Sequence, residues 1–241
     1  MAAATIASKP DYGLDMPATV RSMFSRAGWT LVFAIALFYV NHAEYPGPAD
    51  QLLIVLGVIA LGFLAAGLYM VWSSRVAKFQ IRDQILDSLQ LRGDERVLDL
   101  GCGTGLLLVG AAKRLKSGRV TGVDFSGAAD TAKENAKLEG VADKIRIDSG
   151  NEAKLVYPDG QFDVAVSAMA LHQIGDADTR ERLVREMWRT LKPGGRLAIF
   201  DVLRTGEYSK ELRKNGVNNV ELTPPRFLWC LPARSVRATK P

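Results

Sequence analysis

The sequence predicts an α/β fold in which two transmembrane helices precede a doubly wound, mostly parallel sheet of seven strands that ends in an antiparallel hairpin. Two apolar runs without charged residues, Trp29–Val40 and Leu52–Trp72, come before most of the charge of the 241-residue chain. From Arg75 onward, short β-branched runs alternate with helical patterns, which is typical of βαβ units. We therefore expect a membrane part followed by a soluble domain.

The second apolar run has 21 residues, close to the roughly 20 that a helix needs to cross the hydrocarbon layer. The first run reaches that length only if residues 27–28 and 41–43 are included. Because Arg21 and Arg26 precede it, a secretory signal peptide is the main alternative, but no small-x-small cleavage site follows. The turn-forming segment 41–50 instead favours a helical hairpin at 27–72. It would separate an N-terminal segment, 1–26, from a soluble domain at 73–241.

Basic residues near the two runs predict the orientation. They precede the first run and follow the second, with none between, so both ends should face the cytoplasm of a multi-pass integral membrane protein; these residues are Arg21, Arg26, Arg75, Lys78 and Arg82. Two cysteines, Cys102 and Cys230, suit a reducing compartment. The net charge of +5 comes without a basic stripe interleaved with aromatics. We therefore expect anionic lipid headgroups rather than nucleic acid as the partner.

The soluble part predicts five parallel strands joined by helices, then a further helix and two terminal strands. The five strands are expected at 96–100, 119–123, 144–147, 162–167 and 196–200. The helices are expected at 76–89, 106–115, 128–139, 179–191 and 208–215. Strands at 220–222 and 235–239 would finish the sheet as an antiparallel hairpin.

The segment Val97–Gly105 is an apolar strand that ends in an acid, Asp99, and runs into glycines before a helix. A loop without Cβ atoms lets the backbone approach a ligand closely at the carboxyl end of a strand. Glycines at every second position, Gly101, Gly103 and Gly105, differ from the dinucleotide fingerprint, in which two residues separate the second and third glycines. The segment resembles motif I of the class I S-adenosylmethionine-dependent methyltransferases.

This resemblance continues in family order over about residues 80–201 and implies a Rossmann-like domain that binds S-adenosylmethionine. It implies that Asp99 meets the cationic amino-acid portion of the cofactor and that Asp124, closing the next strand, accepts from the ribose diol. Asn151 occupies the position of an Asp that accepts from the adenine amine, and Glu152 competes for that role. The turn at 191–197 is similar to one in the ubiquinone and menaquinone C-methyltransferases. Further cofactor contacts are implied for Cys102, Phe125 and Ser167, and no metal ion is expected.

His172 follows the fourth strand, where the family has a segment beside the reactive methyl. An imidazole titrates near pH 6.5 and can act as a base, although relatives with unrelated substrates also carry this histidine, which favours a packing role against the cofactor. Residues 11–17 precede the first span and form either a disordered terminus or a lid. A lid would bring Tyr12 or Asp15 to the substrate pocket.

The motifs leave the acceptor open, because peripheral segments set the substrate in this superfamily. The membrane hairpin favours a hydrophobic or lipid-like acceptor; the alternatives are a small soluble acceptor, with the hairpin used for localisation, and a non-catalytic cofactor-binding scaffold. Gly62 and Ala66 have a spacing that lets helices approach closely, which favours a packed hairpin or a homodimer. Trp229, in an apolar connection, is either an interfacial anchor or part of the core.

Overall fold

The computed structural model describes residues 9–42, 45–150, 154–228 and 231–241. It consists of two compact units. One comprises the chain up to Tyr12 together with residues 79–241, and the other comprises residues 13–78. Because the helix α3 (Lys78–Ser88) begins in one unit and continues in the other, the boundary lies within continuous helix.

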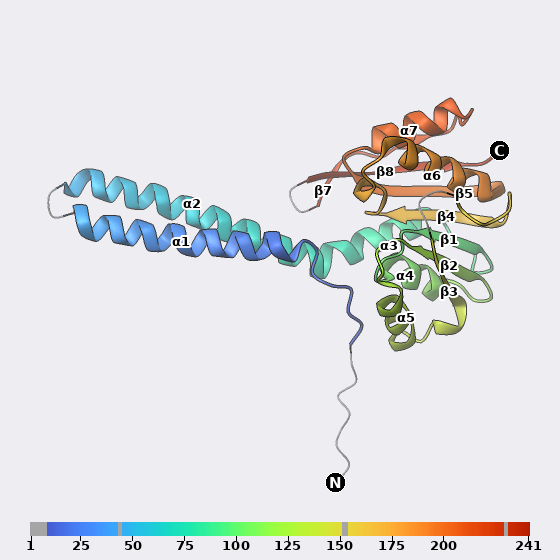
Figure 1. The fold of residues 1–241 in the computed structure, drawn as a ribbon, viewed down its shortest axis with the longest axis horizontal. Coiled ribbons are helices and arrows are strands. Elements are labelled where there is room, and N and C mark those ends of the chain that lie inside the picture. The colour runs from blue at the N-terminus through green and yellow to red at the C-terminus, as the bar shows by residue number, and fades with distance from the viewer. Residues whose placement is uncertain (1–8, 43–44, 151–153, 229–230) are drawn as a thin grey trace, which may run out of the picture. The chain divides into compact units, whose positions relative to one another are not determined.

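The larger unit is built on one eight-stranded sheet in the order β3-β2-β1-β4-β5-β8-β6, with β7 paired to β8 (Figure 1). Strands β1 to β5 are parallel to one another, β8 pairs antiparallel with β5, and β6 and β7 pair antiparallel with β8. The mostly parallel sheet with an antiparallel end is therefore confirmed. The strands are β1 (Arg96–Leu100), β2 (Arg119–Asp124), β3 (Ile145–Ser149), β4 (Phe162–Ala168), β5 (Leu191–Val202), β6 (Glu221–Leu222), β7 (Arg226–Leu228) and β8 (Leu231–Thr239).

Helices cover both faces of this sheet. Right-handed crossovers on either side of the strand-order reversal place them on opposite faces. α4 (Leu106–Arg114) and α5 (Ala129–Leu138) pack on the β1–β3 half, while α6 (Ala177–Thr190) and α7 (Thr205–Lys214) pack against β5 and its neighbours. The single-turn helices are η2 (Ala142–Lys144) and η3 (Leu171–Gln173).

The strand order reverses between β1 and β4, so the chain leaves these adjacent strands toward opposite faces of the sheet. In open α/β sheets such a reversal leaves a crevice at the carboxyl ends of the strands, where ligands bind. The segments that follow β1 and β4 contain the glycine loop and His172. The fold thus brings these two sequence motifs to the same edge.

Local features of the sheet differ from the sequence prediction. β5 begins at Leu191 rather than at residue 196, because Leu191 pairs with Phe162 before residues 192–195 loop out and pairing resumes at Arg196. Gly194, with φ of 76°, allows the chain to turn there. The proline-bearing connection expected between the last two strands contains the additional short strand β7.

The smaller unit is a hairpin of two long helices, α1 (Pro17–Asn41) and α2 (Pro46–Trp72), followed by the π-helical turn η1 (Ser73–Ala77). The helices pack together closely where a Cβ at Gly67 would lie 3.2 Å from the ring of Phe24. A Cβ at Gly62 would meet no described atom within 4 Å, so α1 and α2 do not pack together at Gly62. A homodimer through this glycine stays a prediction.

Both helices are long and apolar enough to cross a membrane. They expose large apolar side chains, which in water would be costly to leave uncovered in such number. These side chains include Trp29, Leu31, Val32, Phe33, Ile54, Val55, Val58 and Leu61. The first helix begins at Pro17, ten residues earlier than the predicted span at residue 27.

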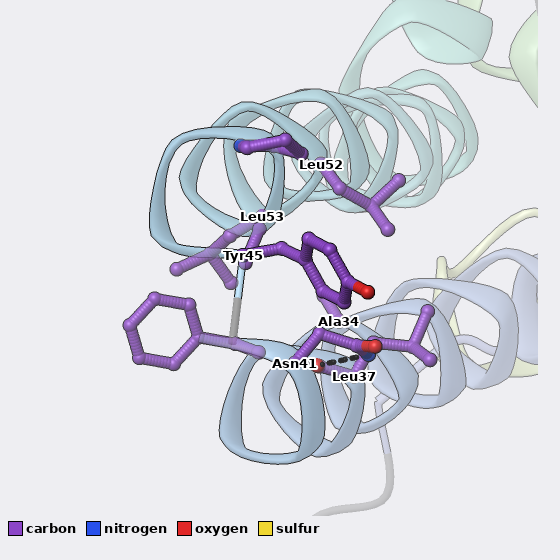
Figure 2. A pocket seen from close by; sticks show the side chains of 9 residues that line it. Ala34, Leu37, Asn41, Tyr45, Leu52 and Leu53 are labelled. Carbon is purple, nitrogen blue, oxygen red and sulfur yellow. Dashed lines mark hydrogen bonds between the residues drawn. The ribbon is translucent and has the colours of Figure 1, made fainter. Parts of the chain in front are cut away.

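Near the turn of the hairpin, side chains from both helices line a small cavity of about 240 Å³ (Figure 2). The lining is mostly apolar, with Leu37 on α1 and Leu52 on α2. Asn41 satisfies its amide by donating to the carbonyl of Leu37 at 2.9 Å. Beside it, Nδ1 of His42 lies 3.1 Å from Oδ1 of Asp50, so polar groups occur at this end of an otherwise apolar hairpin.

Candidate active site

The glycine loop connects the carboxyl end of β1 to the start of α4. The backbone N–H groups of Gly101 and Cys102 both donate to the carbonyl of Val123, at 2.8 and 3.1 Å, which fixes the loop to the end of β2. Gly101, Gly103 and Gly105 have φ of 75°, 50° and 86°, a left-handed conformation that favours glycine. The alternation of glycines is therefore a requirement of the backbone path.

The missing Cβ atoms have different consequences along the loop. A Cβ at Gly101 would lie 2.2 Å from the Cβ of Ala170, so this glycine permits close approach of the segment that follows β4. A Cβ at Gly103 would meet no described atom within 4 Å. The backbone at Gly103 therefore borders open space that a ligand can enter.

Asp99 lies on β1, two residues before the loop, and is 1% exposed. Burial raises the pKa of Asp99 to about 7, and a hydrogen bond from the backbone N–H of Leu108 partly opposes this. Its Oδ2 atom is buried with no hydrogen-bond partner among the described residues. An unsatisfied buried carboxylate oxygen is costly unless a donor or a cation reaches it, so Asp99 is suited to meeting a cationic ligand.

Asp124 closes β2 beside the loop and is 7% exposed. Its Oδ1 accepts from the backbone N–H and hydroxyl of Ser126, at 2.9 and 2.8 Å, and its Oδ2 accepts from the N–H of Ala129 at 3.0 Å. Because each carboxylate oxygen has two lone pairs, Oδ2 retains one acceptor position. A diol could use that position and replace the Ser126 hydroxyl on Oδ1.

His172 lies in η3, directly after β4, and contacts Asp201 at the end of β5. Its Nδ1 is 2.5 Å from Asp201 Oδ1, and its backbone N–H donates to Asp201 Oδ2 at 2.9 Å. Asp201 is 1% exposed, whereas the His172 side chain is 23% exposed. The imidazole is therefore oriented by a buried carboxylate while part of it remains accessible.

Two further donors complete the coordination of Asp201. The N–H of Val202 donates to Oδ1 at 2.8 Å and the hydroxyl of Tyr208 to Oδ2 at 3.2 Å. Burial raises the pKa of Tyr208 above its usual range, so the phenol stays protonated as a donor. Three donors thus reach the two oxygens of Asp201, from the backbone of His172 and Val202 and from Tyr208. Because a carboxylate only accepts, a neutral His172 ring beside ionised Asp201 carries its proton on Nδ1, which leaves Nε2 as the basic nitrogen.

Backbone strain flanks this pair. Met169, before η3, and Leu203, after β5, have φ of 57° and 59°, which non-glycine residues rarely adopt. Arg180, 2% exposed, holds the chain after η3 by donating to the carbonyls of Ile174 and Gly175 at 2.7 and 2.9 Å. Strain of this kind is typical of functional sites that the surrounding structure holds in place.

Comparison with known proteins agrees with this geometry. Residues 97–195 match a family described as a methyltransferase domain. This chain contains a domain of the class I S-adenosylmethionine-dependent methyltransferases. It is 29% identical over 132 residues to a sterol 4-C-methyltransferase of Caenorhabditis elegans, covering 54% of this chain and 38% of that protein. It is 31% identical over 122 residues to a demethylmenaquinone methyltransferase of Lactobacillus johnsonii, covering 50% and 49%.

The fold of the methyltransferase domain is shared more widely than its sequence. A crystal structure of a SAM-dependent methyltransferase from Aquifex aeolicus superposes with a TM-score of 0.54 at 20% identity, covering 66% of this chain and 88% of that one. The chain spans about half or less of the length of the two curated relatives. S-adenosylmethionine is the cofactor of the family.

The residues of the methyltransferase domain fit this cofactor. Asp99 offers an unpartnered carboxylate oxygen, Gly103 borders open space, and Asp124 keeps an acceptor position. A sulfonium nucleoside with an ammonium group and a ribose diol presents the charges and donors that these groups lack. The contacts expected of Asn151 and Glu152 lie outside the described residues, as does Trp229.

The other residues expected to contact the cofactor have different local contacts. Ser167 is 1% exposed and donates its hydroxyl to the carbonyl of Leu100 at 2.8 Å, which ties β4 to β1. Phe125 packs against the core beside Gly150, where a Cβ would lie 2.9 Å from the ring. Burial, with the charges of Asp99 and Asp124, raises the pKa of the Cys102 thiol, which therefore stays protonated and unreactive.

Tyr12 and Asp15 each have contacts of their own. Tyr12 is 8% exposed and packs edge-on against Phe79 with ring centroids 5.6 Å apart, whereas His172 contacts Asp201. Asp15 belongs to the hairpin unit, where its carboxylate lies 3.4 Å from Nζ of Lys78. A role for either side chain in the acceptor pocket stays a prediction.

Proposed function

We propose that the chain is an integral membrane methyltransferase that transfers the methyl group of S-adenosylmethionine to a hydrophobic or lipid-like acceptor. The observation that supports this most is the covalent continuity of a methyltransferase domain with two long helices whose large apolar side chains are exposed. An anchor of this kind keeps the domain beside the phase in which apolar acceptors concentrate. The names of two curated relatives, which act on a sterol and on demethylmenaquinone, support the same acceptor class.

The cofactor supplies an activated methyl group, so this chain contributes mainly orientation, exclusion of water and proton transfer. Asp99, the glycine loop and Asp124 would hold the cofactor. Asp201 fixes the ring of His172 with Nε2 free, and Nε2 would accept the proton of an acceptor hydroxyl or an acidic carbon. His172 is then the catalytic base, and Asp201 and Tyr208 are positioning residues. The base role is preferred here over a packing role because a buried carboxylate selects the tautomer.

The anchoring predicts a specific result on fractionation. Membranes from cells that express the full chain should retain both the protein and its methyl-transfer activity in the pellet after washing with alkaline carbonate, because two spans resist extraction. Recovery of active protein in the supernatant would contradict anchoring by the hairpin. A cysteine-accessibility assay on residues of the hairpin turn would then test whether this turn faces away from the cytoplasm, as the positions of the basic residues predict.

A further inference from the structure

The N-terminal segment Lys9–Tyr12, named the strap below, contacts the helix that follows β2. The backbone N–H of Asp11 donates to Oδ1 of Asn135 at 2.8 Å, and Nδ2 of Asn135 donates to the carbonyl of Asp11 at 2.8 Å. The side-chain amide of Asn135 and the main chain of Asp11 are thus joined by two hydrogen bonds, one donated by each residue. The strap and α5 belong to the same compact unit.

Tyr12 anchors the strap. Its ring is buried against Phe79, and its hydroxyl lies 3.4 Å from Oε1 of Glu139, the C-cap residue that follows α5. Burial raises the pKa of Tyr12 above its usual range, so the hydroxyl remains a donor. Burying an aromatic ring and pairing a polar tip hold a short segment far better than backbone contacts alone.

Asn135 connects the strap to the cofactor loop. Besides the bond to Asp11, its Nδ2 donates to the carbonyl of Thr104 at 2.9 Å, between Gly103 and Gly105. Asn135 is 2% exposed, so both donors and the carbonyl oxygen of its amide are used inside the protein. Without the strap, this buried amide would lose two of its three hydrogen bonds. Such a loss favours rotation of the side chain or entry of water.

We infer that the strap and Asn135 are positioning elements for the cofactor loop, so that docking of Asp11 and Tyr12 on α5 and binding of S-adenosylmethionine reinforce each other. Any ligand that prefers the docked form must, by linkage, stabilise docking to the same extent. The inference rests on the proposed cofactor site and is independent of the acceptor. It gives the segment ahead of α1 a role in the affinity for the cofactor.

The test is calorimetric titration of S-adenosylmethionine into the purified full chain in lipid nanodiscs. A chain that starts at Gly13 after an initiating Met lacks the strap, and a chain that lacks residues 1–8 keeps it as the matched control. We expect Kd to rise about tenfold, which corresponds to about 1.4 kcal/mol, without the strap and to stay within about twofold in the control. Unchanged affinity without the strap would refute the inference, whereas no binding to the full chain would refute the cofactor site.

A double-mutant cycle distinguishes positioning from a general loss of stability. Asn135→Ala and removal of the strap should weaken binding by similar factors, and together by no more than either alone, because each breaks the same connection. Should Asn135→Ala not fold, Tyr12→Ala alone tests the strap: it should raise Kd in the same direction as removal of the strap, and an unchanged Kd would refute the inference. Multiplicative effects would show that the two act independently and would overturn the inference.

Discussion

The Asp201→Asn variant should transfer methyl groups at least about a hundredfold more slowly than the wild type, with affinity for S-adenosylmethionine within about threefold. The Asp201 carboxylate can only accept a hydrogen bond from Nδ1 of His172, whereas an asparagine amide can instead donate one to Nδ1. Such donation would put the ring proton on Nε2 of His172. The basic lone pair would then be lost from the nitrogen proposed to take the proton of the methyl acceptor. Measuring kcat at saturating cofactor, together with calorimetric Kd, separates the loss of the base from a loss of binding.

Two further variants show whether the loss of turnover comes from losing the base. His172→Ala should lose a similar factor in kcat, because it removes the base itself. Tyr208→Phe removes one donor to Asp201 but leaves the tautomer of His172 unchanged, so its loss should be only a few-fold. Equal turnover by the wild type and His172→Ala would eliminate the base and return His172 to a packing role.

Asp99 should make cofactor binding depend on proton concentration. Its pKa of about 7 in the ligand-free protein means that it is largely protonated at pH 6 and ionised at pH 8. A cationic ligand beside Oδ2 lowers this pKa, so binding releases a proton and affinity increases with pH. Calorimetry should find S-adenosylmethionine bound about tenfold more tightly at pH 8 than at pH 6.

The matched variant is Asp99→Asn, which keeps the shape and removes the charge. It should bind the cofactor more weakly at pH 8 and lose the part of the pH dependence that Asp99 causes. Since the folded pKa of Asp99 is raised above the unfolded value of about 3.9, its ionisation opposes folding increasingly from pH 4 and fully above pH 7. The ligand-free variant should therefore melt at a higher temperature than the wild type at pH 8. A wild-type affinity that is flat with pH would contradict contact between Asp99 and the cation.

The fold was predictable from sequence where local pattern and backbone geometry agree. The glycines of the loop have left-handed φ, so the pattern that indicated the motif is also what the chain path requires. β7 was missed because prolines at 224, 225 and 232 suggested a loop. β7 has only three residues and lies at the edge of the sheet, so it needs few backbone N–H donors. Prolines, which lack this donor, are tolerated at such an edge.

The candidate site was predictable only in part, because its most informative contacts join residues distant in sequence. Asp201 lies 29 residues after His172, and the parallel pairing of β4 with β5 brings them together. An acid at the carboxyl end of a strand, Phe200-Asp201-Val202, was the available signal. The sequence held no such signal for Asn135, since an asparagine within a helix usually faces solvent. Its burial is explained by the docking of the strap.

The most direct test of the proposed function is to incubate the full chain in nanodiscs with methyl-labelled S-adenosylmethionine and a total membrane lipid extract, and then to separate the organic and aqueous phases. We expect label in a product of the organic phase, and its loss with Asp201→Asn. Label transferred to a water-soluble product instead would contradict a hydrophobic acceptor and leave the hairpin as a means of localisation.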